Sequence, residues 1–150
     1  MNGQAEINEI VDRETEAFNT KNVDLFLSVI HPDMVWPWPP NMKAHDPIEW
    51  VLPWGRFNQQ RWHGYLQKFF DKYELIHNKR HTQRIVMSKE GDGAFAVVDV
   101  NSLWRSRAGD ELHWNGRACK AYTLLNLEWK MISQVGLLDY SAKSQLIGTN

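Results

Sequence analysis

The chain has 150 residues, a formal net charge of −1, and hydrophobic residues at 43% of its positions. This length fits one domain over residues 1–150, and we expect its core at 5–138 and a polar tail at 139–150. The near-neutral charge excludes a typical nucleic-acid-binding protein, which carries a basic excess to neutralise phosphates. The longest apolar run, 94–98, is too short to cross a membrane.

The cysteine and histidine residues exclude several kinds of site. Cys119 is the single cysteine, so neither an intramolecular disulfide nor a cysteine-based zinc site is expected. His77 and His81 fall on a predicted strand about 13 Å apart, so we predict no metal site and no cofactor. The first ten residues lack the features of a secretory signal, which favours a cytoplasmic protein.

The N-terminal half of the chain is predicted to be helical. Apolar residues recur at helical spacing in three segments, 4–20, 23–30 and 59–72. Pro32 ends the second helix, and a short strand is expected at 34–36. Five prolines then predict a stiff loop at 37–55, because proline removes a backbone donor.

The C-terminal half changes to strand patterns. Turn signals separate four segments rich in β-branched and aromatic residues, at 74–89, 94–105, 112–125 and 129–138. Helices followed by long antiparallel strands predict an α+β fold, in which the helices pack on one face of a curved sheet.

Three stretches carry a resemblance to a known superfamily. They are AFNTKNVDLFLSVIHPDMVW at 17–36, the helix at 59–72 that leads directly into the long strands, and EWKMISQV at 128–135. Their order and spacing resemble the NTF2-like (SnoaL-like) superfamily. The resemblance implies a cone, in which a strongly curved sheet of four long strands and a short N-terminal strand wraps around three helices. It also implies a conical cavity and a homodimer through the sheet.

The superfamily includes ketosteroid isomerase, polyketide cyclases, epoxide hydrolases and dehydratases, besides binding and oligomerisation domains, so the fold leaves the function open. The catalytic residues of ketosteroid isomerase are not found at the corresponding positions of this sequence. Its tyrosine position falls on Glu14 and its base on Trp38, and no acid lies at 119–121.

The epoxide-hydrolase pattern is matched in part. It uses two aspartates and an arginine, and Asp99, Arg117 and Asp139 lie on, or at the end of, three successive predicted strands. Val97, however, occupies the position where the resemblance implies a second arginine.

Several polar residues on apolar faces are candidate catalytic groups. Glu14 interrupts the apolar stripe of the first helix, and Asp99 and Arg117 lie within strands. We predict that these three meet inside the cone, where Arg117 keeps the carboxylates ionised. The alternative is a purely structural ion pair. His45, in the proline-rich loop, is a candidate general acid or base, the alternative being a surface residue.

The chain contains eight tryptophans, five of them within 36–62. Trp36 and Trp38 flank Pro37 and are predicted to wall an apolar pocket, the alternative being core filler or a dimer contact. Outward-facing bulky residues such as Trp104 favour a homodimer. Further candidate ligand-binding residues are Phe18, Tyr65, Asn101 and Asp139.

Together these features favour a protein that binds a small apolar or aromatic molecule. The alternatives are a cofactor-independent hydrolase, isomerase or dehydratase that works by general acid/base catalysis, and a non-catalytic oligomerisation module. Neither a nucleic acid nor a membrane is an expected partner.

Overall fold

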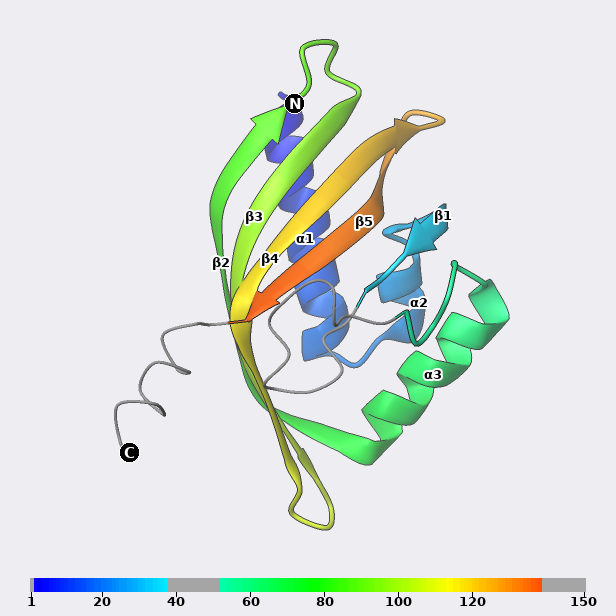
Figure 1. Ribbon diagram of the computed structural model, residues 1–150, viewed down its shortest axis with the longest axis vertical. Coiled ribbons are helices and arrows are strands. Elements are labelled where there is room, and N and C mark those ends of the chain that lie inside the picture. Colours follow the sequence, from blue (N-terminus) through cyan, green and yellow to red (C-terminus); the bar gives the residue numbers. More distant parts are fainter. Residues whose placement is uncertain (1, 38–51, 139–150) are drawn as a thin grey trace.

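The computed structural model describes residues 2–37 and 52–138. Within these residues, three helices and five strands are present (Figure 1). The elements are α1 (Gly3–Asn19), α2 (Val23–Leu27), β1 (Ile30–Val35), α3 (Gln59–Lys72), β2 (Tyr73–Met87), β3 (Gly93–Ser106), β4 (Glu111–Leu125) and β5 (Glu128–Leu138).

Each helix begins at an asparagine that caps it. The side chains of Asn2, Asn22 and Asn58 accept hydrogen bonds from backbone N–H groups in the first turns of α1, α2 and α3. These bonds satisfy donors that have no partner inside the helix. Helix α1 ends where Lys21 takes a left-handed conformation, with φ 52°, and the chain turns directly into α2.

The five strands form one sheet in the order β1-β5-β4-β3-β2. The long strands β2 to β5 pair antiparallel, whereas β1 pairs parallel to β5. Register shifts interrupt β2 between Leu75 and His77 and between Thr82 and Arg84, and irregularities of this kind bend and twist a strand. The sheet therefore curves, and α1 lies along its inner face while α3 lies beside its lower part and leads into β2 (Figure 1). The predicted α+β fold is confirmed.

Alternation along β3 separates the two faces of the sheet. Even-numbered residues from Ala94 to Ser106 are buried against the helices, and odd-numbered residues face outward. Phe95, with 65% of its surface exposed, stands on the outer face.

The core is rich in aromatic rings. Trp62 is fully buried, and Trp36 stacks on Phe26 with ring centroids 5.3 Å apart. At the other end, Trp104 packs edge-on against Phe69 at 4.9 Å. Such contacts add to the hydrophobic stabilisation of burial.

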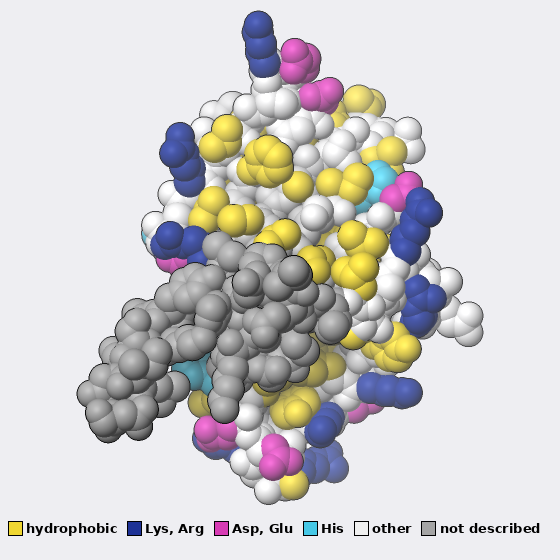
Figure 2. Space-filling model, viewed as in Figure 1, with side chains coloured by type: hydrophobic (Ala, Val, Ile, Leu, Met, Phe, Trp, Pro, Cys, Tyr) yellow, Lys and Arg dark blue, Asp and Glu magenta, His cyan; other side chains and the backbone are white. Residues whose placement is uncertain are grey.

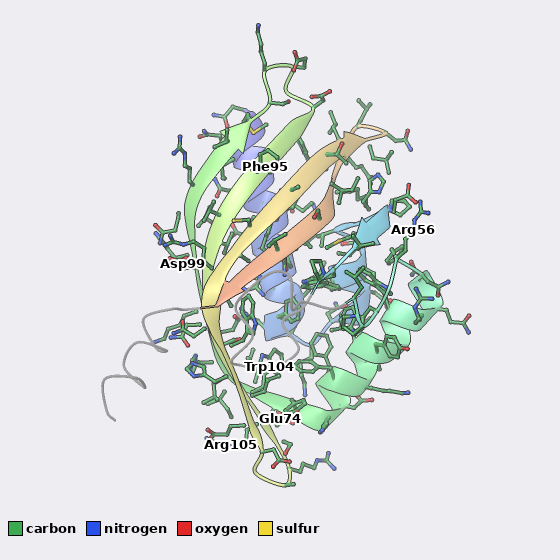
Figure 3. The ribbon with its side chains drawn as sticks, viewed as in Figure 1. Arg56, Glu74, Phe95, Asp99, Trp104 and Arg105 are labelled. Atoms are coloured by element: carbon green, nitrogen blue, oxygen red, sulfur yellow. The ribbon has the colours of Figure 1, made fainter. Side chains whose placement is uncertain are left out.

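Three sequence predictions need correction. The first strand spans Ile30–Val35 rather than 34–36, so Pro32 lies within it and does not end the second helix. The second helix ends at Leu27, not at residue 30, because β1 already begins at Ile30, where the N–H of Met131 bonds the carbonyl of Val29 at 2.7 Å. Trp104 does not face outward. Only 5% of it is exposed, and it lies between the sheet and α3 (Figure 3).

No helix among residues 2–37 and 52–138 is both long and apolar enough to cross a membrane.

Replacing either of two glycines by alanine should change the free energy of unfolding, in opposite directions at the two positions. A Cβ atom at Gly136 would lie 2.9 Å from a ring carbon of Trp114, so Gly136→Ala should lower the free energy of unfolding by about 1–3 kcal/mol. A Cβ atom added at Gly64, inside α3, would meet nothing within 4 Å beyond its chain neighbours and the adjacent helix backbone, so Gly64→Ala should raise the free energy of unfolding by about 0.5–1 kcal/mol. Urea unfolding measures both changes, and equal responses would contradict this packing.

Candidate functional site

A buried ion pair joins α1 to the inner face of the sheet. The Nζ atom of Lys120, on β4, donates to both carboxylate oxygens of Glu14 at 2.8 and 2.6 Å and to Oε1 of Gln134 at 2.7 Å. The three residues are between 1% and 4% exposed. Gln134 lies opposite Lys120 on β5, so the sheet register positions both partners. All three ammonium donors are thereby used.

Arg80 brings a second cation to this carboxylate. Its Nη1 atom lies 3.5 Å from Oε1 of Glu14, and its guanidinium lies over the ring of Phe18, 5.0 Å from the centroid. The Arg80 side chain is 12% exposed. Among the residues that the structure describes, none hydrogen-bonds to the buried Nη1 atom.

Tyr122 adds a neutral donor to the same interior. It lies on the inner face of β4, two residues after Lys120, and is 3% exposed. Its buried hydroxyl also finds no hydrogen-bond partner within the described part of the chain. We call Glu14, Arg80, Lys120, Tyr122 and Gln134 the interior polar cluster.

Burial and charge act against each other in this cluster. Burial opposes ionisation of Glu14, but the charges of Lys120 and Arg80, together with the hydrogen bonds from Lys120, hold its pKa below the ordinary value. Burial lowers the pKa of Lys120 to about 8, against the attraction of Glu14. Burial, reinforced by the charge of Glu14, raises the pKa of Tyr122 well above its ordinary value. At neutral pH, two cations therefore face one carboxylate, and the cluster carries one net positive charge.

The prediction that Glu14, Asp99 and Arg117 meet inside the cone is wrong. Asp99 and Arg117 are odd-numbered strand residues and lie on the outer face of the sheet, opposite the face that Glu14 contacts. Arg117 donates to Asp99 through Nε at 2.6 Å and Nη2 at 3.0 Å, and Gln83 donates to the same carboxylate at 2.6 Å. The hydrogen bonds from Arg117 lower the pKa of Asp99, and Asp99 raises that of Arg117.

The remaining candidate residues are distributed widely. Phe18 and Trp36 belong to the buried aromatic core, where Trp36 is 3% exposed. Tyr65 is 40% exposed, with its ring 6.3 Å from that of Trp54. Asn101 faces outward and binds His113. The proposed roles of Trp38, His45 and Asp139 concern positions outside the described residues.

An open hollow of about 790 Å³ lies between the turn after α1, the end of α3 and the β3–β4 hairpin. It contains none of the predicted site residues. Its charged lining is balanced, with three basic and three acidic side chains from Lys21, Asp71, Lys72, Glu74, Arg107 and Asp110. Among the described residues, no three metal-ligating side chains of the His, Cys, Asp or Glu type converge.

Breaking the buried pair is predicted to destabilise the fold. Lys120→Met leaves the carboxylate of Glu14 without its closest cation, which costs about 3–5 kcal/mol of unfolding free energy. The double variant Glu14→Leu/Lys120→Met removes the uncompensated charge and should lose less. Arg117→Met breaks an exposed pair and serves as the matched control with a small effect. Urea unfolding of the four proteins, including the wild type, is the measurement. An equal loss for Lys120→Met and Arg117→Met would refute the assignment.

The same ion pair should also determine how the stability of the protein changes with pH. Glu14 has a lowered folded pKa, so its contribution is lost as pH falls below about 4.5. Lys120 releases its proton at about pH 8 in the folded state and near 10.5 when unfolded, so stability should rise with pH from about 8. Unfolding of the wild type and of Glu14→Leu/Lys120→Met, followed from pH 3 to 9.5, tests both slopes. Curves that run parallel would contradict the two shifts.

Comparison with known proteins identifies the fold. No family model matches the chain, and no curated protein matches it. Solved structures do match. An NTF2-like protein from Cytophaga hutchinsonii has a TM-score of 0.66 at 13% identity, over 93% of this chain and 100% of that one. A ketosteroid isomerase-like protein from Erwinia carotovora has a TM-score of 0.65 at 12% identity, over 87% and 91% of the two chains.

A third similar structure is a candidate calcium/calmodulin-dependent protein kinase II association domain from Xanthomonas campestris. Its TM-score is 0.59 at 15% identity, and the match covers 89% of this chain and 86% of that one. At these identities the likeness establishes the fold and no activity. The chain is a protein of the NTF2-like fold.

Proposed function

We propose that this chain binds a small molecule with an apolar or aromatic body and a carboxylate, which faces the interior polar cluster. The observation that carries the proposal is a pair of buried donors, Nη1 of Arg80 and the hydroxyl of Tyr122. Neither hydrogen-bonds to a described residue, and the nearest approach of Nη1 to an acid is the ion pair with Glu14 at 3.5 Å. A buried donor without a partner costs stability, so its presence in a folded protein needs an explanation. An acceptor group on a ligand supplies one.

The charge of the cluster supports an anionic group on that ligand. One carboxylate, Glu14, balances only one of the two cations beside it. A guanidinium pairs well with a second carboxylate, and burial strengthens the attraction. The ligand's charge would bring the interior to neutrality.

The aromatic core supports an apolar body for the ligand. Phe18 lies under the guanidinium of Arg80 and is edge-on to Phe26, which in turn stacks on Trp36. These rings pack on one another beside the cluster, and aromatic side chains with a few placed polar groups are typical of small-molecule sites.

Binding is better supported than acid/base catalysis. Glu14 has a lowered pKa, so it does not hold a proton to donate near pH 7, and both its oxygens accept bonds from Lys120. Tyr122 has a raised pKa, so it suits donation of a hydrogen bond rather than removal of a proton. The ketosteroid isomerase-like neighbour does not change this, because the likeness concerns the fold.

The binding proposal predicts opposite effects on stability and affinity at Tyr122. Tyr122→Phe removes a buried hydroxyl without a partner, so the unfolding free energy should stay equal or rise by about 1 kcal/mol. Affinity for the carboxylate ligand should nevertheless fall. Intrinsic tryptophan fluorescence, titrated with benzoate, phenylacetate and 1-naphthoate and with their amides, measures binding.

Arg80 provides the second arm of this test. Arg80→Met should weaken binding of the carboxylates about tenfold or more, because a charged hydrogen bond is lost. Arg84→Met is the matched control, since Arg84 lies on the same strand with an exposed side chain. Equal affinity for carboxylates and amides, or equal effects at Arg80 and Arg84, would contradict the proposal.

We also propose that two copies of the chain associate through the outer face of the sheet. Phe95 and Val86 form a cross-strand pair there, 65% and 46% exposed. Hydrophobic side chains gather over the strands in this view of the surface (Figure 2). Exposed apolar groups of this kind mark contact surfaces. The association-domain neighbour is compatible with oligomerisation.

The dimer is tested by light scattering at micromolar concentration. We expect twice the chain mass for the wild type and the mass of one chain for Phe95→Asp. Leu127→Asp is the control, because Leu127 is 92% exposed but lies in the β4–β5 turn. A wild type with the mass of one chain would exclude the dimer at that concentration.

A further inference from the structure

Two histidines face each other across the outer side of the sheet, away from the interior polar cluster. His77 on β2 and His113 on β4 are both paired in register with Leu103 on the central strand β3. Their ring centroids are 6.2 Å apart and the rings are nearly perpendicular, at 79°. His113 is exposed and His77 half-buried, so solvent reaches the pair.

Asn101 fixes the orientation of both rings. Nδ1 of His77 lies 3.2 Å from the backbone carbonyl oxygen of Asn101, and Nε2 of His113 lies 3.0 Å from its side-chain oxygen. An oxygen of either kind accepts, so each of these ring nitrogens carries the proton. The opposite nitrogens, Nε2 of His77 and Nδ1 of His113, therefore carry lone pairs.

The hydrogen bonds to Asn101 match those that metal-binding histidines make through their second ring nitrogen. A histidine ligand usually donates its other ring N–H to a carbonyl or carboxylate, which sets the tautomer and aims the lone pair at the ion. Here one residue, Asn101, supplies both acceptors. Imidazole nitrogen suits zinc, copper and nickel, whereas magnesium and calcium prefer oxygen.

We propose that His77 and His113 bind a divalent transition-metal ion such as Zn²⁺ through Nε2 and Nδ1, with Asn101 as the positioning residue. Two imidazoles on one tetrahedral zinc ion have centroids about 5 Å apart, given Zn–N bonds of about 2.0–2.1 Å. The observed 6.2 Å is about 1 Å longer, so both side chains must rotate slightly toward each other when the ion binds. No third His, Cys, Asp or Glu joins them among the described residues, so water or an exchangeable ligand completes the coordination.

Such an ion would link β2 to β4 across β3. Because it binds only the folded chain, which holds the two rings together, its binding raises the thermal midpoint of unfolding. The metal site lies on the outer face alone, so its test is independent of whether the proposed ligand binds in the interior.

Isothermal titration of the tag-free chain with Zn²⁺, with Mg²⁺ in parallel, tests the site. We expect one Zn²⁺ per chain and no response to Mg²⁺. His77→Gln and His113→Gln should each weaken binding about tenfold or more, as should Asn101→Leu. His81→Gln is the matched control, because His81 lies on the same face of β2, four residues beyond His77. It should bind as the wild type does.

Nitrogen NMR of the histidine rings gives a readout that does not depend on affinity. Before zinc is added, His77 should carry its proton on Nδ1 and His113 on Nε2, and zinc should shift the opposite nitrogens. The titration is repeated with Phe95→Asp, so that loss of a dimer and loss of the metal site are distinguished. Absence of wild-type binding, or equal loss in the His81 variant, would overturn the proposal.

Discussion

The structure depends on one buried ion pair, between Glu14 of α1 and Lys120 of β4. Both side chains are 2% exposed, so neither charge has water to solvate it, and each is tolerated only because the other is present. Gln134 on β5 takes the remaining ammonium donor. The pair therefore fixes how α1 lies against two strands of the sheet, and hydrophobic packing around it, which is not directional, does not set that position alone.

The same pair determines what the interior can do. Arg80 adds a second cation next to Glu14, and Tyr122 adds a neutral hydroxyl, so the interior holds an excess of donors over acceptors. A carboxylate already ionised and saturated by Lys120 is a poor proton carrier, whereas unused donors and an unbalanced charge suit recognition of an anion. This is the physical reason to prefer binding over catalysis for this protein.

Much of the fold can be predicted from the sequence, whereas little of the candidate site can. The helix at 59–72 and the four long strands follow from the change of apolar period at Tyr73. Glu14 is identified because it interrupts an apolar helix stripe. Its partner does not follow from the sequence, because β3 is apolar on both faces, as Phe95 and Ala96 show, and alternation along that strand does not say which face is inside. Lys120 lies on the strand face opposite Arg117. The sequence signal for an inward-facing Lys120 is that it shares its face with Tyr122.

Titration of Lys120 by carbon NMR of its ε-methylene is the most direct test, because a buried ammonium group beside a second cation should have a lowered pKa. We expect a midpoint near pH 8 in the free protein, rising when an aromatic carboxylate binds. A midpoint at the ordinary lysine value near 10.5, unchanged by any carboxylate, would show that the ammonium group is solvated and that the interior carries no unbalanced charge.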